Sequence, residues 1–134
     1  MALIADTHAL LWYINDSPEL SNTAFSALES VEQLGEPIYV PSICLVEIRY
    51  LVEKGKDIEE ADYQTILALL LDRYSALTLA PLDLPVAEAL AQIPRSIVPD
   101  MPDRIIAATA LVLGLPLVTR DHKIQALTNI KMIW

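Results

Sequence analysis

Short apolar runs alternate with longer segments of helical periodicity along the whole chain. The runs expected to form strands are residues 2–5, 38–40, 77–80 and 117–119, with residues 130–134 as a further edge strand. A strand that is apolar on both faces belongs inside a parallel sheet covered by helices. We therefore expect an α/β protein with a single domain over residues 1–134. Its mostly parallel sheet should have about four to five short strands with helices on both faces.

The segments between these strands predict helices whose ends are marked by glycine and proline. The expected helices cover residues 8–14, 21–34, 43–54, 62–74 and 86–92, and a loop over residues 94–102 leads to one more helix that starts at residue 103. In this last helix, residues 105–113 leave almost no polar face, so it should lie inside the protein. Gly114 is placed to end it. Two acids, Asp103 and Asp121, would then lie at opposite ends of a rigid buried unit.

Composition limits the class of protein. The chain has 134 residues and is 54% hydrophobic, which is enough for one domain with a real core and excludes a disordered chain. The single cysteine, Cys44, cannot form an internal disulfide and is expected to be a packed apolar residue. No apolar run is long enough to span a bilayer, and no basic region precedes a signal-type segment, so we expect a cytoplasmic protein.

The charge is unevenly distributed. A formal net charge of −9 argues against a general nucleic-acid binder that works by bulk electrostatics. Acids dominate residues 1–90, whereas residues 91–134 carry a slight excess of bases. Arg104, Arg120 and Lys123 gather around the buried unit. They are either solvated or candidate phosphate contacts.

Four acids are placed where they could converge. Asp6 follows the first strand and Asp121 follows a later one, so both should emerge at the carboxyl edge of the sheet, where sites of open α/β folds lie. Glu47, in the second turn of the helix after the second strand, and Asp103 should lie near the same edge. Thr119 would share the surroundings of Asp121. Carboxylates without histidine or cysteine ligands favour Mg²⁺ or Mn²⁺, which can activate water and neutralise a phosphodiester.

Four sequence blocks carry a resemblance to a known family: LIADTHALLW around Asp6, PSICLVEI around Glu47, PDRIIAATA around Asp103 and PLVTRD ending at Asp121. In this order and spacing the chain resembles the PIN-domain nucleases and, among them, the VapC-type toxins of bacterial type II toxin–antitoxin pairs. The resemblance implies a PIN fold, metal-dependent endoribonuclease activity on RNA, and a small antitoxin that blocks the site.

The resemblance also implies roles for residues. The four acids would be ligands of Mg²⁺ or Mn²⁺, or would orient metal-bound water, and Thr119 would be an accessory polar group. One departure concerns the residue before the second acid. Several relatives have Trp or Ser there, whereas this chain has Val46.

Each acid also has a structural interpretation as a turn former, a helix cap or a solvated side chain. Asp100 competes with Asp103 for the site, and its position predicts a loop acid. His8 and His122 are too few and too far apart in sequence for a histidine metal site. A phosphatase of the haloacid-dehalogenase type is disfavoured because His8 stands where it needs an acid. A nucleotide-binding module is disfavoured because only three glycines are present.

Two further expectations concern partners. The alternative to a nuclease is a catalytically silent PIN-like domain that serves as a protein-binding module. The helices expected at residues 43–54 and 62–74 are more apolar than two surface helices of a monomer normally are. They predict a groove for an amphipathic segment of an antitoxin, and a homodimer for the free protein.

Overall fold

The computed structural model describes residues 1–56 and 58–134. Its centre is a five-stranded sheet in the order β3-β2-β1-β4-β5, and every pair of neighbouring strands is parallel. The strands are β1 (Leu3–Ala5), β2 (Ile38–Pro41), β3 (Leu77–Ala80), β4 (Leu117–Val118) and β5 (Met132–Ile133). The predicted α/β class and parallel sheet are confirmed. The strand β1 is central, because Ile4 pairs with Tyr39 of β2 on one side and with Leu117 of β4 on the other.

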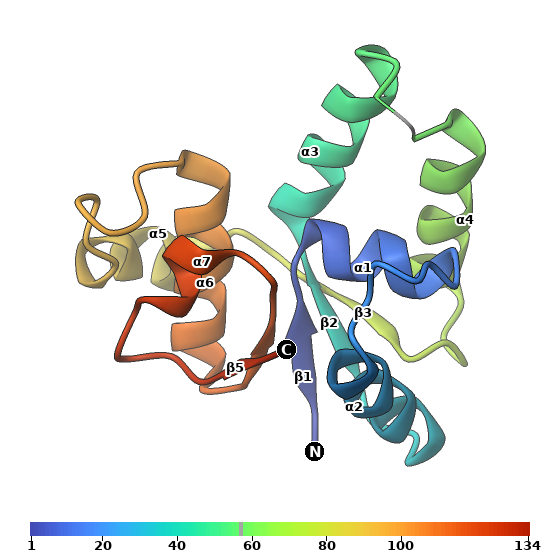
Figure 1. Ribbon diagram of the computed structural model, residues 1–134, viewed down its shortest axis with the longest axis horizontal. Helices are drawn as coiled ribbons and strands as arrows, with labels where there is room; N and C mark the ends of the chain where they lie inside the picture. Colours follow the sequence, from blue (N-terminus) through green and yellow to red (C-terminus); the bar gives the residue numbers. More distant parts are fainter. Residues whose placement is uncertain (57) are drawn as a thin grey trace.

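Helices connect the strands and pack around the sheet (Figure 1). Their bounds are α1 (Thr7–Ile14), α2 (Asn22–Gln33), α3 (Ser42–Glu53), α4 (Glu60–Leu71), α5 (Leu84–Ala89), the 3-10 helix η1 (Leu90–Gln92), α6 (Met101–Leu113) and α7 (His122–Gln125). In Figure 1, α5, α6 and α7 gather on one side of β1, and α1, α3 and α4 lie on the other. No helix within the described residues is both long and apolar enough to cross a membrane.

Several predicted boundaries are corrected by capping. The helix expected from residue 62 begins two residues earlier, at Glu60, because Glu59 is its N-cap and forms a capping box with Asp62, and it ends at Leu71 rather than at residue 74. The helix expected from residue 103 begins at Met101, because Asp100 is its N-cap. The segment expected as one helix over residues 86–92 divides into α5 and η1, and the edge strand is shorter than residues 130–134.

The helix α6 is the main apolar element beside the sheet. Its residues Ile105–Ala110 are all buried, as predicted, and they pack with α3, α5, η1 and α7. The prediction is wrong for the last turn, where the Val112 and Leu113 side chains are 42% and 40% exposed. Gly114 then ends the helix with a left-handed backbone, φ 65°. A rigid, buried helix therefore sets the position of the acids at its N-terminus.

Candidate metal centre

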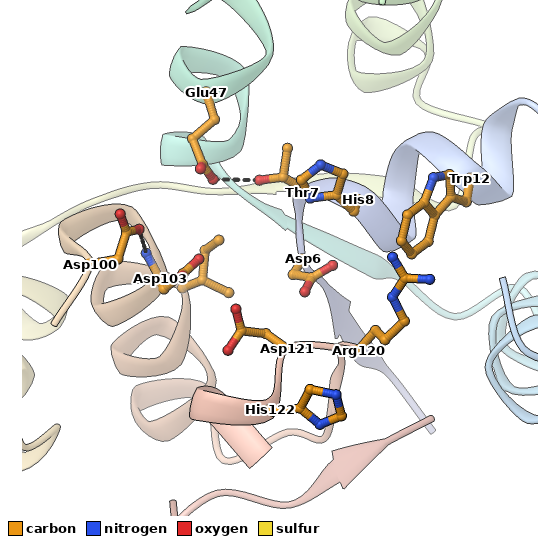
Figure 2. A pocket seen from close by; sticks show the side chains of 11 residues that line it. Asp6, Thr7, His8, Trp12, Glu47, Asp100, Asp103, Arg120, Asp121 and His122 are labelled. Carbon is orange, nitrogen blue, oxygen red and sulfur yellow. Dashed lines mark hydrogen bonds between the residues drawn. The ribbon is translucent and has the colours of Figure 1, made fainter. Parts of the chain in front are cut away.

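A pocket of about 820 Å³ lies at the carboxyl edge of the sheet. The chain reaches it from three strands: Asp6 directly follows β1, Glu47 lies in the second turn of the helix after β2, and Asp121 follows β4. The residues that line the pocket are Asp6, Thr7, His8, Trp12, Glu47, Asp100, Asp103, Ile106, Arg120, Asp121 and His122. All four predicted acids thus belong to one cavity (Figure 2).

Asp6 is fixed at the junction between β1 and α1. It is the N-cap of α1, and its Oδ1 accepts a hydrogen bond of 2.9 Å from the Ala9 amide. Burial raises the pKa of the Asp6 carboxyl, while hydrogen bonding from Thr119 and Ala9 lowers it in part. Thr119 itself is fully buried, and its Oγ1 accepts a hydrogen bond of 3.0 Å from the Asp121 amide.

Glu47 is oriented by a residue that the sequence did not single out. The hydroxyl of Thr7, itself buried, donates a hydrogen bond of 2.6 Å to Glu47 Oε1. Burial raises the pKa of Glu47, the bond from Thr7 opposes this, and the charge of Asp100 raises the pKa further. The only sequence signal for Thr7 is its position directly after Asp6, where a hydroxyl would enter the same pocket.

Asp100 and Asp103 lie together at the N-terminus of α6. Asp100 Oδ2 accepts a hydrogen bond of 3.1 Å from the Asp103 amide, so Asp100 caps the helix. One carboxylate oxygen from each of Glu47, Asp100 and Asp103 lies within 4.8 Å of the other two. The prediction of Asp100 as a loop acid is therefore corrected. Its spacing of three residues before Asp103 is the signal, because an N-cap must lie close to the third residue of its helix.

The surroundings of Asp103 raise its pKa to about 7. Burial is the largest cause, followed by the charges of Asp100, Asp121 and Glu47. Its carboxylate accepts no hydrogen bond from the part of the chain that the structure describes. A half-buried acid among other acids, with no donor to stabilise its charge, is well placed to meet a cation.

Asp121 faces the pocket from β4 and α7. It is the N-cap of α7, with Oδ1 accepting from the amides of Lys123 (2.8 Å) and Ile124 (3.0 Å), and its own amide donates to Thr119 Oγ1 at 3.0 Å. Figure 2 shows the Asp6 and Asp121 side chains in the same pocket as Glu47, Asp100 and Asp103, with the Asp121 carboxylate on the Asp103 side. The five acids therefore line one cavity.

A model of the family described as "PIN domain" matches residues 3–129. The chain belongs to the PIN-domain family. Among curated proteins it is 27% identical, over 124 residues, to Ribonuclease VapC22 of Mycobacterium tuberculosis, covering 92% of this chain and 90% of that protein. The family predicted from the four sequence blocks is confirmed.

Solved structures share the fold of this PIN domain. A crystal structure of VapBC2 from Rickettsia felis, bound to a DNA fragment from its promoter, matches with a TM-score of 0.71 at 22% identity, covering 98% of this chain and 97% of the other. DNA-bound VapBC from Salmonella typhimurium matches with a TM-score of 0.72 at 20% identity, covering 98% and 96%. The likeness extends over nearly the whole PIN domain.

The three candidate phosphate contacts of this PIN domain differ in position. Arg120 lines the pocket. Arg104 does not, because its guanidinium donates to the backbone oxygens of Leu90 and Ile93 at 2.8–3.1 Å and ties η1 to α6. Lys123 is exposed on α7 and is also absent from the pocket lining.

The donor set of the PIN domain fits a hard divalent cation. The group of oxygens within 4.8 Å consists of carboxylates alone, and Mg²⁺ and Mn²⁺ prefer oxygen ligands. Burial is the main reason that the pKa values of Glu47 and Asp103 are raised, and the charges of the neighbouring acids raise both further. A cation between them would remove this repulsion.

Proposed function

We propose that this PIN domain is an endoribonuclease that depends on Mg²⁺ or Mn²⁺ and acts as the toxin of a toxin–antitoxin pair. The observation that carries the proposal is the group formed by Glu47, Asp100 and Asp103, in a pocket that also holds Asp6 and Asp121. The ribonuclease named among its relatives, which it matches over most of its length, supports RNA as the substrate.

Each residue of the pocket would have a distinct task. Glu47, Asp100 and Asp103 would hold the cation, with Thr7 fixing the rotamer of Glu47. A divalent cation in such a site lowers the pKa of water and neutralises charge on a phosphodiester. Asp6 and Asp121, each fixed by backbone amides, would position the attacking water and the RNA strand. Hydrolysis then adds this water to phosphorus and breaks one P–O bond.

The proposed partner is a small antitoxin protein. The matched structures from Rickettsia and Salmonella are VapBC complexes, and another from Klebsiella pneumoniae is described as a toxin–antitoxin complex. On this chain, α3 exposes Val46 and Tyr50 and α4 exposes Leu71. We infer that an amphipathic antitoxin segment contacts this surface, and that the free protein is a homodimer.

Cleavage of a labelled single-stranded RNA tests the enzymatic proposal. The purified protein is incubated with the RNA in Mg²⁺, in Mn²⁺, and in chelator, and we expect cleavage only with a cation. A reaction that continues in chelator would rule out the metal role. Absence of cleavage with both cations, together with a melting temperature that ignores them, would favour the silent binding module.

A second experiment tests the partner. The open reading frame next to the gene is co-expressed with the toxin, and the pair is purified through a tag on the neighbour. We expect a stable complex that no longer cleaves RNA. Sedimentation of the protein alone tests the homodimer, and a strict monomer at micromolar concentration would contradict it.

A further inference from the structure

The pocket has two chemically different ends. One end carries Glu47, Asp100 and Asp103. At the other end, Figure 2 shows Trp12 and Arg120 side by side, with His8 nearby. A nuclease site needs acids for a cation, but it does not need an indole and a guanidinium for that purpose. The second end therefore calls for its own explanation.

Arg120 is the only lysine or arginine among the described residues that line the pocket. Its guanidinium carbon lies 4.4 Å from the centre of the Trp12 ring, which is the distance of a cation–π contact. Trp12 is supported in turn by Trp134 and His8, with ring centres at 5.9 Å and 5.5 Å. The guanidinium therefore lies on an aromatic support that restricts its motion.

The edge of the same guanidinium meets Glu19. Arg120 Nη1 lies 2.9 Å from Glu19 Oε2, and both side chains are at least half exposed. Exposed ion pairs contribute little to stability, so this contact is weak enough to be exchanged. An RNA phosphodiester carries one negative charge on two non-bridging oxygens, as a carboxylate does, and arginine can bind either anion through two parallel hydrogen bonds.

We propose that Trp12 and Arg120 form a nucleotide subsite, which rests on the proposed function. An unpaired base of the RNA stacks on the face of the guanidinium that Trp12 does not cover, and the adjoining phosphate replaces Glu19 at its edge. Bases of single-stranded RNA stack both on aromatic rings and on arginine planes, and such contacts are tolerant of sequence. The occupant is thus one nucleotide next to the bond that is cut.

The subsite is held in register with the acids by the chain itself. Arg120 directly precedes Asp121, and Trp12 lies on α1, which begins immediately after Asp6. A strand held by this subsite must therefore pass the acids at a constant distance. Among the described residues that line the pocket, Arg120 of this subsite alone offers a permanent positive charge to a polyanion.

Binding of two RNA decamers tests the subsite. The protein carries Asp103→Asn so that it does not cut, and fluorescence anisotropy in Mg²⁺ gives the Kd for an intact decamer and for one with abasic sites throughout. We expect Arg120→Gln to weaken the intact decamer about tenfold, the typical value of one stacked base. Arg120→Lys keeps the positive charge but lacks the planar guanidinium on which a base can stack. This variant should therefore bind the intact and the abasic decamer with similar Kd. Glu19→Gln should strengthen binding of both decamers.

The matched control is Arg95→Gln, which removes one exposed loop arginine outside the pocket lining and changes the net charge equally. If Arg95→Gln and Arg120→Gln weaken binding by the same factor, or if Arg120→Lys keeps the base preference, the subsite is wrong. In the cleaving protein, Arg120→Gln should raise KM more than it lowers kcat. An unmutated protein that cleaves with a cation while Arg120→Gln has an unchanged KM would overturn the subsite alone. A protein that neither binds nor cleaves RNA would overturn the proposed function as well.

Discussion

The helices α4 and α6 are similar in sequence pattern but differ in how much of each is buried in the fold. Each is 12 or 13 residues long, is largely apolar and carries an acid as its third residue, Asp62 in α4 and Asp103 in α6. Yet α6 buries every residue from Ile105 to Ala110, whereas α4 buries only Ile66. The difference arises from their neighbours, because α6 packs against several elements and α4 mainly against α3 and β3.

The two third-residue acids differ for the same reason. In α4, the Asp62 carboxylate accepts a hydrogen bond of 2.8 Å from the Glu59 amide and completes a capping box. In α6 the cap is supplied by Asp100, which bonds the Asp103 amide and leaves the Asp103 carboxylate to face the pocket. An identical sequence position thus serves the helix in one case and the site in the other. Paired variants of the two helices can measure this difference.

The largest effect is expected for catalysis. Asp103→Asn should reduce RNA cleavage by about 100-fold or more. The carboxamide keeps the shape of the side chain but loses the negative charge that binds a cation. A bound cation stabilises the transition state by several kcal/mol. Asp62→Asn, the matched change in α4, should leave the rate within about twofold, since it touches only a cap. Initial rates in Mg²⁺ decide. Equal losses in both variants would mean that Asp103 is only a helix acid.

The second largest difference between α4 and α6 is expected in the free energy of unfolding. Ile106→Ala in α6 removes a side chain that is 1% exposed, and should lower the free energy of unfolding by about 2–5 kcal/mol. Leu67→Ala in α4 removes a half-buried side chain and should cost about 1 kcal/mol or less. Urea unfolding followed by circular dichroism gives both values. If Leu67→Ala lowers the free energy of unfolding as much as Ile106→Ala does, the two helices contribute equally to the core.

The dependence of stability on pH should distinguish the two acids. The pKa of Asp103 is about 7 in the folded protein, above its ordinary value of 3.8, so the folded state binds a proton more tightly than the unfolded state. Its favourable contribution is fully present below pH 3.8 and is lost as the pH rises through 7. Without metal, Asp103→Asn should reduce this loss of stability, while Asp62→Asn should not.

Metal should reverse the same loss. A cation at a hundredfold excess over its Kd would add about 2.7 kcal/mol to stability at neutral pH. Melting curves from pH 4 to 8, with and without Mg²⁺ or Mn²⁺, test both statements. If the melting temperature falls equally with rising pH in the unmutated protein, Asp103→Asn and Asp62→Asn, and does not respond to the cations, the loss of stability does not come from Asp103.

The smallest effect on the isolated protein is expected at the surface of α4. Leu71 is 79% exposed, so Leu71→Gln should change the free energy of unfolding by about 0.5 kcal/mol or less. It should nevertheless weaken self-association and antitoxin binding, because an exposed apolar side chain gains most from a partner. Val112→Gln, on the exposed last turn of α6, is the control for polarity alone. If both variants associate like the unmutated protein, α4 is not the contact surface.

Much of the fold could be predicted from the sequence because it depends on local rules. Apolar runs bounded by turns predicted the strands around Ile4 and Leu117, and Gly114 predicted the end of α6. The placement of Asp6 and Asp121 after strands predicted their meeting, since all parallel strands present their carboxyl ends at one edge. These inferences need only the chain direction and the period of the side chains.

Only the tertiary structure decided the rest, because it depends on contacts between residues far apart in sequence. Thr7 and Glu47 are 40 positions apart, and Arg120 and Glu19 are 101 apart, so no local pattern reveals their hydrogen bonds. The raised pKa of Asp103 likewise arises from burial and, besides the neighbouring Asp100, from the charges of Asp121, Glu47 and Asp6 on three other segments. The local sequence determined the position of each acid at the end of a strand or the start of a helix. Packing determined how deeply each acid is buried and which charges surround it.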